Sequence, residues 1–127
     1  MSVSMQFGKP IAAAGGKPAT EALTPTVTQT SGNTSIVGAE AVRYGNVILF
    51  NFDFKFTGTV NAGSNAFVGS ISGLPAPALP AQGTGYFSNS ALIAALDPDF
   101  TFTIRVVGGN RSSSDTKASI RLLYICN

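Results

Sequence analysis

The segment VILFNFDFKFT, residues 47–57, decides the fold class of this 127-residue chain. Its apolar side chains take every second position. They are Ile48, Phe50, Phe52, Phe54 and Phe56. The polar side chains between them are Asn51, Asp53 and Lys55. Strict alternation of this length is the pattern of a β-strand with one buried and one exposed face. We therefore predict a strand whose phenylalanine face lies in the core, rather than an aromatic stripe that binds a ligand.

The same period of two continues on both sides of this segment, from Thr24 to Cys126. The other predicted strands cover residues 24–30, 34–42, 67–72, 86–96, 100–106 and 118–126. Turns and loops rich in glycine and proline separate them, the longest being 74–85, and no segment has the 3.6-residue period of a helix. The pattern predicts an all-β fold. We expect an antiparallel β-sandwich, jelly-roll-like, with about seven or eight strands.

Residues 1–23 differ from the rest of the chain. Alanine, glycine, proline and lysine dominate there, and Pro10 and Pro18 would break a helix. We predict a flexible N-terminal docking arm or linker over 1–23 and one β-sandwich domain over 24–127. The alternative for the arm is a disordered terminus with no role.

The composition argues against an enzyme. Charged residues make up 11% of the chain, against about 25% in an ordinary domain. Histidine is absent, which removes the usual general base and most metal sites. A single cysteine excludes an intrachain disulfide and a cysteine-based zinc site. We expect no catalytic residues, no cofactor and no metal. The net charge of +2 comes from eight scattered basic residues, so we expect no nucleic-acid partner.

The apolar runs are too short for targeting or membrane insertion. The run Ile11–Ala14 falls below the 7–15 apolar residues of a secretory signal. No stretch approaches the roughly 20 residues of a membrane span. We expect a protein made in the cytoplasm without a signal peptide, with no membrane insertion.

The last predicted strand is apolar on both faces. Ile120, Leu122 and Tyr124 alternate on one face, while Leu123 and Ile125 lie on the other. A half-exposed antiparallel strand is normally polar on its outer side. We predict that a partner subunit covers Leu123 and Ile125; the alternative is an unusually apolar surface.

Two arginines are candidates for the same interface. Arg105 and Arg121 lie on the same face of consecutive strands, so we expect them opposite or diagonal to each other. Like charges in that position repel unless an anion lies between them. Asp53, Glu40, a carboxylate of another subunit or a bound anion could fill that role. An ion pair between subunits is preferred, and two independently solvated arginines are the alternative.

Three residues on or beside long loops are candidates for binding a saccharide. Tyr86, Asn89 and Arg111 belong to the loop regions 74–89 and 108–117. Sugar sites combine an apolar ring face with hydrogen-bonding groups, which these residue types supply. The alternative is ordinary solvent-exposed loops.

Two further features have ordinary structural explanations. Asp97 and Asp99 flank a proline and could bind Ca²⁺ or form a glycosidase pair, but Asp-Pro-Asp is also common turn chemistry. We favour the turn. Cys126 is expected to be a small buried apolar residue.

Several short motifs, spread over residues 24–126, resemble a known family. The segment AVRYGNVIL, residues 41–49, is similar to the "R-x-G-N-V-V" segment of phage tail-fibre, head-fibre and baseplate receptor-binding domains. The Thr-rich residues 26–32 resemble the strand before it, and SISGLPAP, residues 70–77, resembles the stretch after it. Residues 86–89 and 103–105 fit the later strands.

The resemblance implies a trimeric tip domain of a bacteriophage particle. Such domains are typically homotrimers on a fibre or baseplate and bind host-surface saccharide. The resemblance therefore implies a virion protein that is structural and adhesive. This chain departs from the family in lacking a long fibrous shaft. Two alternatives remain: a non-viral carbohydrate-binding β-sandwich module and a purely structural capsid decoration protein.

Overall fold

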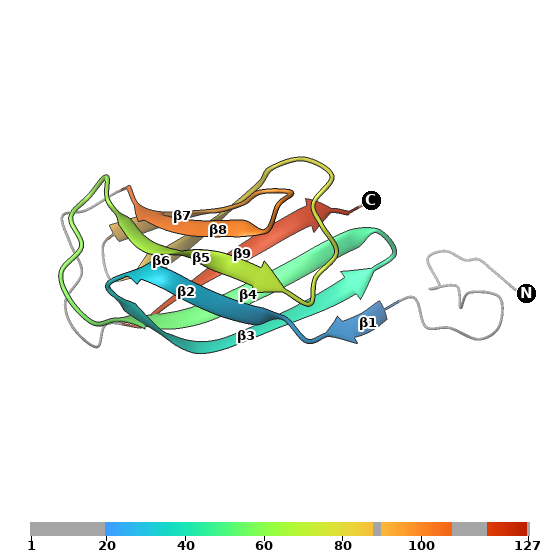
Figure 1. The fold of residues 1–127 in the computed structure, drawn as a ribbon, viewed down its shortest axis with the longest axis horizontal. Coiled ribbons are helices and arrows are strands. Elements are labelled where there is room, and N and C mark those ends of the chain that lie inside the picture. The colour runs from blue at the N-terminus through green and yellow to red at the C-terminus, as the bar shows by residue number, and fades with distance from the viewer. Residues whose placement is uncertain (1–19, 88–89, 108–116, 127) are drawn as a thin grey trace, which may run out of the picture.

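Nine antiparallel strands form one curled sheet in the computed structural model, which describes residues 20–126 apart from 88–89 and 108–116 (Figure 1). The strands are β1 (Thr20–Leu23), β2 (Thr26–Gly32), β3 (Thr34–Tyr44), β4 (Val47–Phe56), β5 (Asn65–Ser72), β6 (Ala81–Phe87), β7 (Ser90–Leu96), β8 (Thr101–Val106) and β9 (Lys117–Ile125). The described residues contain no helix, and therefore none that could span a membrane. The all-β antiparallel prediction is confirmed.

The strand order is β1-β3-β4-β9-β6-β7-β8-β5-β2. The first and last strands of this order are consecutive in the sequence, and only Thr24 and Pro25 separate them. The N-terminal segment therefore pairs with β3 at one edge, bends at Pro25, and pairs with β5 at the other edge. Figure 1 shows the result: the sheet curls into a half-barrel with β2 lying over β3.

The concave side of the sheet encloses the core. All five apolar residues of the deciding segment are buried, as predicted, and the phenylalanines of β4 pack against Phe67 of β5 and Phe102 of β8. The ring centroids of Phe52 and Phe67 are 5.3 Å apart, and those of Phe50 and Phe102 are 5.7 Å apart. Both halves of the curled sheet therefore meet on one aromatic cluster.

Two predictions about the architecture are not confirmed. All nine strands are hydrogen-bonded in one continuous sheet, whereas we expected a two-sheet sandwich with seven or eight strands. The additional strands are β1, which lies in the predicted arm, and β6, most of which lies in the predicted loop 74–85. The sheet thus begins at Thr20, four residues before the predicted domain boundary.

Glycines explain why β6 does not resemble a strand in the sequence. A Cβ on Gly83 would lie 1.9 Å from the carbonyl oxygen of Arg121 in β9, and one on Gly85 would lie 2.2 Å from that of Ser119. No other residue can occupy positions where two backbones approach so closely. The two glycines let β6 pass β9 at close range.

Candidate functional site

Six apolar side chains form a continuous patch on the convex face of the sheet. Val42, Leu49 and Leu123 occupy directly opposed positions on β3, β4 and β9, and Tyr44, Val47 and Ile125 form the neighbouring row. We call these six residues the outer patch. Leu123 is 64% exposed and Ile125 is 58% exposed, whereas Ile120, Leu122 and Tyr124 of the same strand are buried. The predicted two-sided apolar character of the last strand is confirmed.

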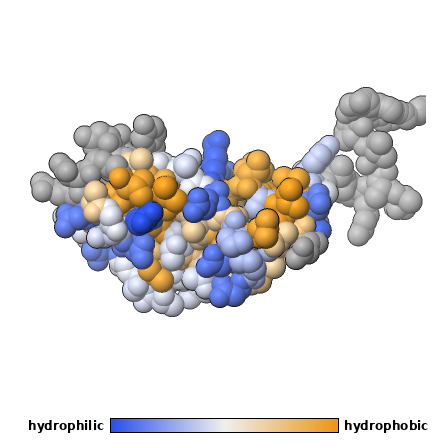
Figure 2. Space-filling view, turned by 90° about the horizontal axis from the view of Figure 1, so that it is seen from above, coloured by the Kyte–Doolittle hydropathy of each residue, from blue (hydrophilic) through white to orange (hydrophobic). Residues whose placement is uncertain are grey.

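The outer patch is large for a surface in contact with water. With five of its six members exposed by more than a third, it amounts to several hundred Å², in the range of about 300–600 Å² for the largest apolar patch of a typical monomer. Patches of that size commonly mark interaction sites. Figure 2 shows another view of the surface, in which apolar side chains gather in two areas with polar side chains between them.

The convex face becomes polar beyond the outer patch. The next row contains Glu40, Asn51 and Arg121 on β3, β4 and β9. In the row after that, the hydroxyl of Ser119 donates a hydrogen bond of 2.5 Å to Asp53. The side-chain oxygen of Asn51 is buried without a hydrogen-bond donor, which is uncommon for a native polar atom.

The two candidate arginines are not neighbours, contrary to the sequence prediction. Arg105 and Arg121 both lie exposed on the convex face, but β6 and β7 lie between their strands. The row across the four strands is Arg121, Thr84, Ile93 and Arg105, each residue directly opposite the next. The prediction failed because it placed β8 and β9 side by side, while the β6–β7 hairpin is inserted between them.

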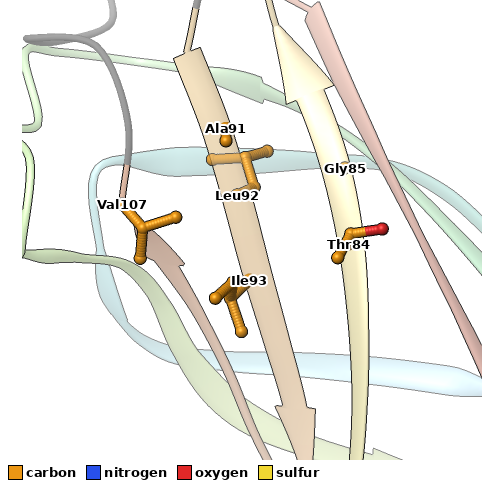
Figure 3. A pocket seen from close by; sticks show the side chains of 6 residues that line it. All are labelled: Thr84, Gly85, Ala91, Leu92, Ile93 and Val107. Carbon is orange, nitrogen blue, oxygen red and sulfur yellow. The ribbon is translucent and has the colours of Figure 1, made fainter.

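A shallow hollow of about 460 Å³ lies between the two arginines. Figure 3 shows the six residues that line it, and these are Thr84, Gly85, Ala91, Leu92, Ile93 and Val107. The lining comes from β6, β7 and the residue after β8, and among the described residues Thr84 contributes the only polar side chain. A Cβ on Gly85 would point toward β9 rather than β7, where it would lie 2.6 Å from Ile120. We call this feature the β6–β8 hollow.

Of the three predicted saccharide residues, the structure describes only Tyr86, whose backbone lies at the same end of the sheet as the hollow. Tyr86 is in β6, opposite Ala91 of β7. The amide of Val107 donates a hydrogen bond of 3.0 Å to the carbonyl oxygen of Ala91, so the segment after β8 starts beside the β6–β7 hairpin. Asn89 and Arg111 lie outside the described residues.

Asp97 and Asp99 form a turn, as favoured. Asp99 accepts a 3.0 Å hydrogen bond from the amide of Thr101, and this bond lowers the pKa of the Asp99 carboxyl. The carbonyl oxygen of Asp97 accepts a 2.8 Å hydrogen bond from the amide of Phe100, which has a φ of 70°. No group of three or more acidic, cysteine or histidine residues that could hold a metal occurs in the described part of the chain.

The C-terminal strand is anchored by the segment that precedes β6. The Tyr124 hydroxyl donates a 2.8 Å hydrogen bond to the carbonyl oxygen of Pro75, and burial, followed by the nearby Cys126, raises the pKa of Tyr124 to about 12. Cys126 is buried, as expected of a small apolar residue, and pairs with Pro77 through an isolated β-bridge.

The β6–β8 hollow is the feature that sequence reasoning missed. We read Gly83-Thr84-Gly85 as part of a loop because glycine is depleted in strands. The signal was nevertheless present: small residues at 81, 83 and 85 alternate with larger polar residues at 82, 84 and 86. Such a pattern fits a strand whose inner face lies against another backbone.

Comparisons with known proteins add no relative. No protein-family model matches the chain, and no curated protein matches it.

Proposed function

We propose that this chain is a non-enzymatic structural and adhesion subunit of a bacteriophage particle, acting as a homotrimer on a fibre or baseplate. In this proposal the outer patch lies at the subunit interface, and the loop end of the sheet binds host-surface saccharide. The N-terminal arm would contact other virion proteins. The phage class, the number three and the saccharide come from the motif resemblance, while the interface is argued from the structure.

The outer patch is the observation that supports this proposal most directly. Its two rows are exposed in the single chain, and burying apolar area is the main favourable term in protein association. In a trimer, three such patches that meet around the three-fold axis would together remove more than about 1,000 Å² from water, close to the lower limit of a specific interface. A second copy of the chain is the simplest cover because it brings a surface of the same character and size.

The architecture supports the same proposal in a more general way. A jelly-roll-like sandwich, which the resemblance implies, encloses its core between two sheets. The curled sheet also packs its two halves on one aromatic core, so we retain a sandwich-like tip domain as part of the proposal.

The interface can be tested with a matched pair of substitutions on β3. Val42 belongs to the outer patch, while Val37 lies five positions away on the same strand, outside it, and is even more exposed. Val42→Lys and Leu123→Lys should convert a trimer into monomers without changing the circular dichroism spectrum. Val37→Lys should leave the trimer intact. Light scattering at micromolar concentration measures the mass.

Two results would count against the proposal. A wild-type protein that is monomeric at every concentration tested would remove the interface. Equal effects of Val37→Lys and Val42→Lys would show that the outer patch is not the contact.

The phage assignment has an independent test: genes for a terminase or tail proteins should lie next to the gene for this chain.

A further inference from the structure

The β6–β8 hollow has an apolar floor, and neither arginine lines it; Arg121 and Arg105 lie on β9 and β8, in the row that Thr84 and Ile93 occupy. Arg121 lies directly opposite Thr84, Thr84 opposite Ile93, and Ile93 opposite Arg105, all on the convex face. Directly opposed side chains on one face of a sheet have Cβ atoms about 5 Å apart. The two arginines are three strand spacings apart, about 14 Å, and their side chains are long enough to reach over the hollow from both sides.

Neither arginine has a carboxylate beside it in this row, within the part of the chain that the structure describes. The other cross-strand neighbour of Arg121 is Asn51, and that of Arg105 is Asn65. Asp53, in the next row, already accepts a hydrogen bond from Ser119. The row therefore carries two positive charges, together with the hydroxyl of Thr84 and the amide of Asn65, while Glu40 lies two strands from Arg121 and Asp53 lies diagonal to it.

This arrangement favours a ligand that is anionic and hydroxylated and has one apolar face. Guanidinium groups bind carboxylates with paired hydrogen bonds, and they do so better than lysine. The apolar floor of Ile93, Ala91 and Val107 suits the C–H face of a sugar ring, while hydroxyl and amide groups around it can bond to sugar hydroxyls. A purely apolar ligand would gain nothing from the arginines.

We propose that the β6–β8 hollow binds an acidic saccharide, with its carboxylates held by Arg105 and Arg121. This inference rests on the proposed saccharide function and narrows it from saccharides in general to those that carry negative charge. It also moves the site from the loop tips to the face of the sheet, where β-strands hold the arginines in place.

The test compares two probes that differ only in charge. Oligogalacturonate is the acidic probe, and the same oligosaccharide with its carboxyl groups reduced to alcohols is the neutral one. Titration calorimetry or NMR titration should give at least about tenfold tighter binding for the acidic probe, since a hydrogen bond to a charged group contributes that much. Binding should weaken as salt is raised from 50 to 500 mM, because exposed charges are screened.

Three substitutions locate the site. Arg105→Gln and Arg121→Gln should each weaken binding of the acidic probe about tenfold and leave that of the neutral probe unchanged. Lys117→Gln removes the same charge from an exposed position on β9, four residues from Arg121, and should have no effect. Light scattering on each variant should show the mass of the wild type.

The outcomes separate this inference from the proposed function. The acidic-saccharide site is overturned if both probes bind equally or if the arginine variants bind the acidic probe as the wild type does. A glycan array that is positive only for neutral sugars would overturn the acidic site but leave the proposed saccharide function intact. If neither probe binds and the arginine variants change the mass, the row is a subunit contact and the site is wrong. A monomeric wild type that binds the acidic probe would support the site and count against the trimer.

Discussion

Replacing Phe52 by alanine should remove a large part of the stability of this protein. The side chain is fully buried at the middle of β4. Its ring lies 5.4 Å from that of Phe54, 5.3 Å from Phe67 and 5.6 Å from Phe102, centroid to centroid. It therefore connects the β4 side of the curled sheet with the β5–β8 side.

The expected cost is about 3–5 kcal/mol, the range for a buried phenylalanine cut to alanine. Edge-to-face ring pairs add about 0.5–1.5 kcal/mol each beyond area burial, so the upper half of that range is expected. A domain of this kind is stable by about 5–15 kcal/mol, so the variant loses about a quarter of its stability or more.

Urea unfolding followed by circular dichroism measures this loss. With an m-value of about 2 kcal/mol per molar, a loss of 4 kcal/mol lowers the midpoint by about 2 M. Protein concentration must be the same in all samples, because association stabilises the folded state. Phe100→Ala, at a half-buried ring beside the core, should cost clearly less. A loss below about 1 kcal/mol for Phe52→Ala would refute the assignment of the aromatic cluster as the core.

Two further predictions concern the backbone and the C-terminal strand. Gly83→Ala should lower the melting temperature and cost at least about 1–3 kcal/mol of unfolding free energy, because the new Cβ would collide with the carbonyl oxygen of Arg121. Gly38→Ala is the control: open space surrounds Gly38, so this variant should be neutral or more stable by up to about 1 kcal/mol. Equal effects of the two substitutions would refute the close approach of β6 and β9. Tyr124 has its pKa raised to about 12 in the folded state against 10 when unfolded, so its contribution to stability is complete below pH 10 and is lost as pH rises toward 12. Tyr124→Phe should therefore be less stable than the wild type by about 1 kcal/mol at neutral pH, because it loses the hydrogen bond to Pro75. Above pH 10 its stability should fall less steeply than that of the wild type, which denaturant titrations at a series of pH values measure. Parallel stability curves of the two proteins would contradict the raised pKa of Tyr124.

The alternation of apolar and polar residues within a segment was enough to predict the strands that have one apolar and one polar face. β4 and β8 alternate strictly, and their apolar residues are buried as expected. The exposed position of Leu123 also followed from alternation along β9, because residues two apart must share a face.

Pairing between strands was not predictable in the same way. The alternation of residues along a strand indicates which face of the sheet a residue occupies, but it does not indicate which strand pairs with that strand. Arg105 and Arg121 share a face, as predicted, yet the inserted β6–β7 hairpin separates them. The β6–β8 hollow is lined by residues of β6 and β7 and by Val107 after β8, so no single segment of the sequence indicates it.

The position of β9 has a consequence for synthesis of the chain. β9 is made after the other eight strands of this sheet, yet it lies in the middle of the sheet, between β4 and β6. Until it leaves the ribosome, β4 and β6 each present an edge with unpaired backbone groups, and the phenylalanine face of β4 lacks Ile120 and Leu122 as neighbours. Incomplete chains of this kind are prone to edge-to-edge aggregation. Products truncated before Lys117 should therefore collect in inclusion bodies, because both strand edges and the phenylalanine face of β4 stay uncovered in them.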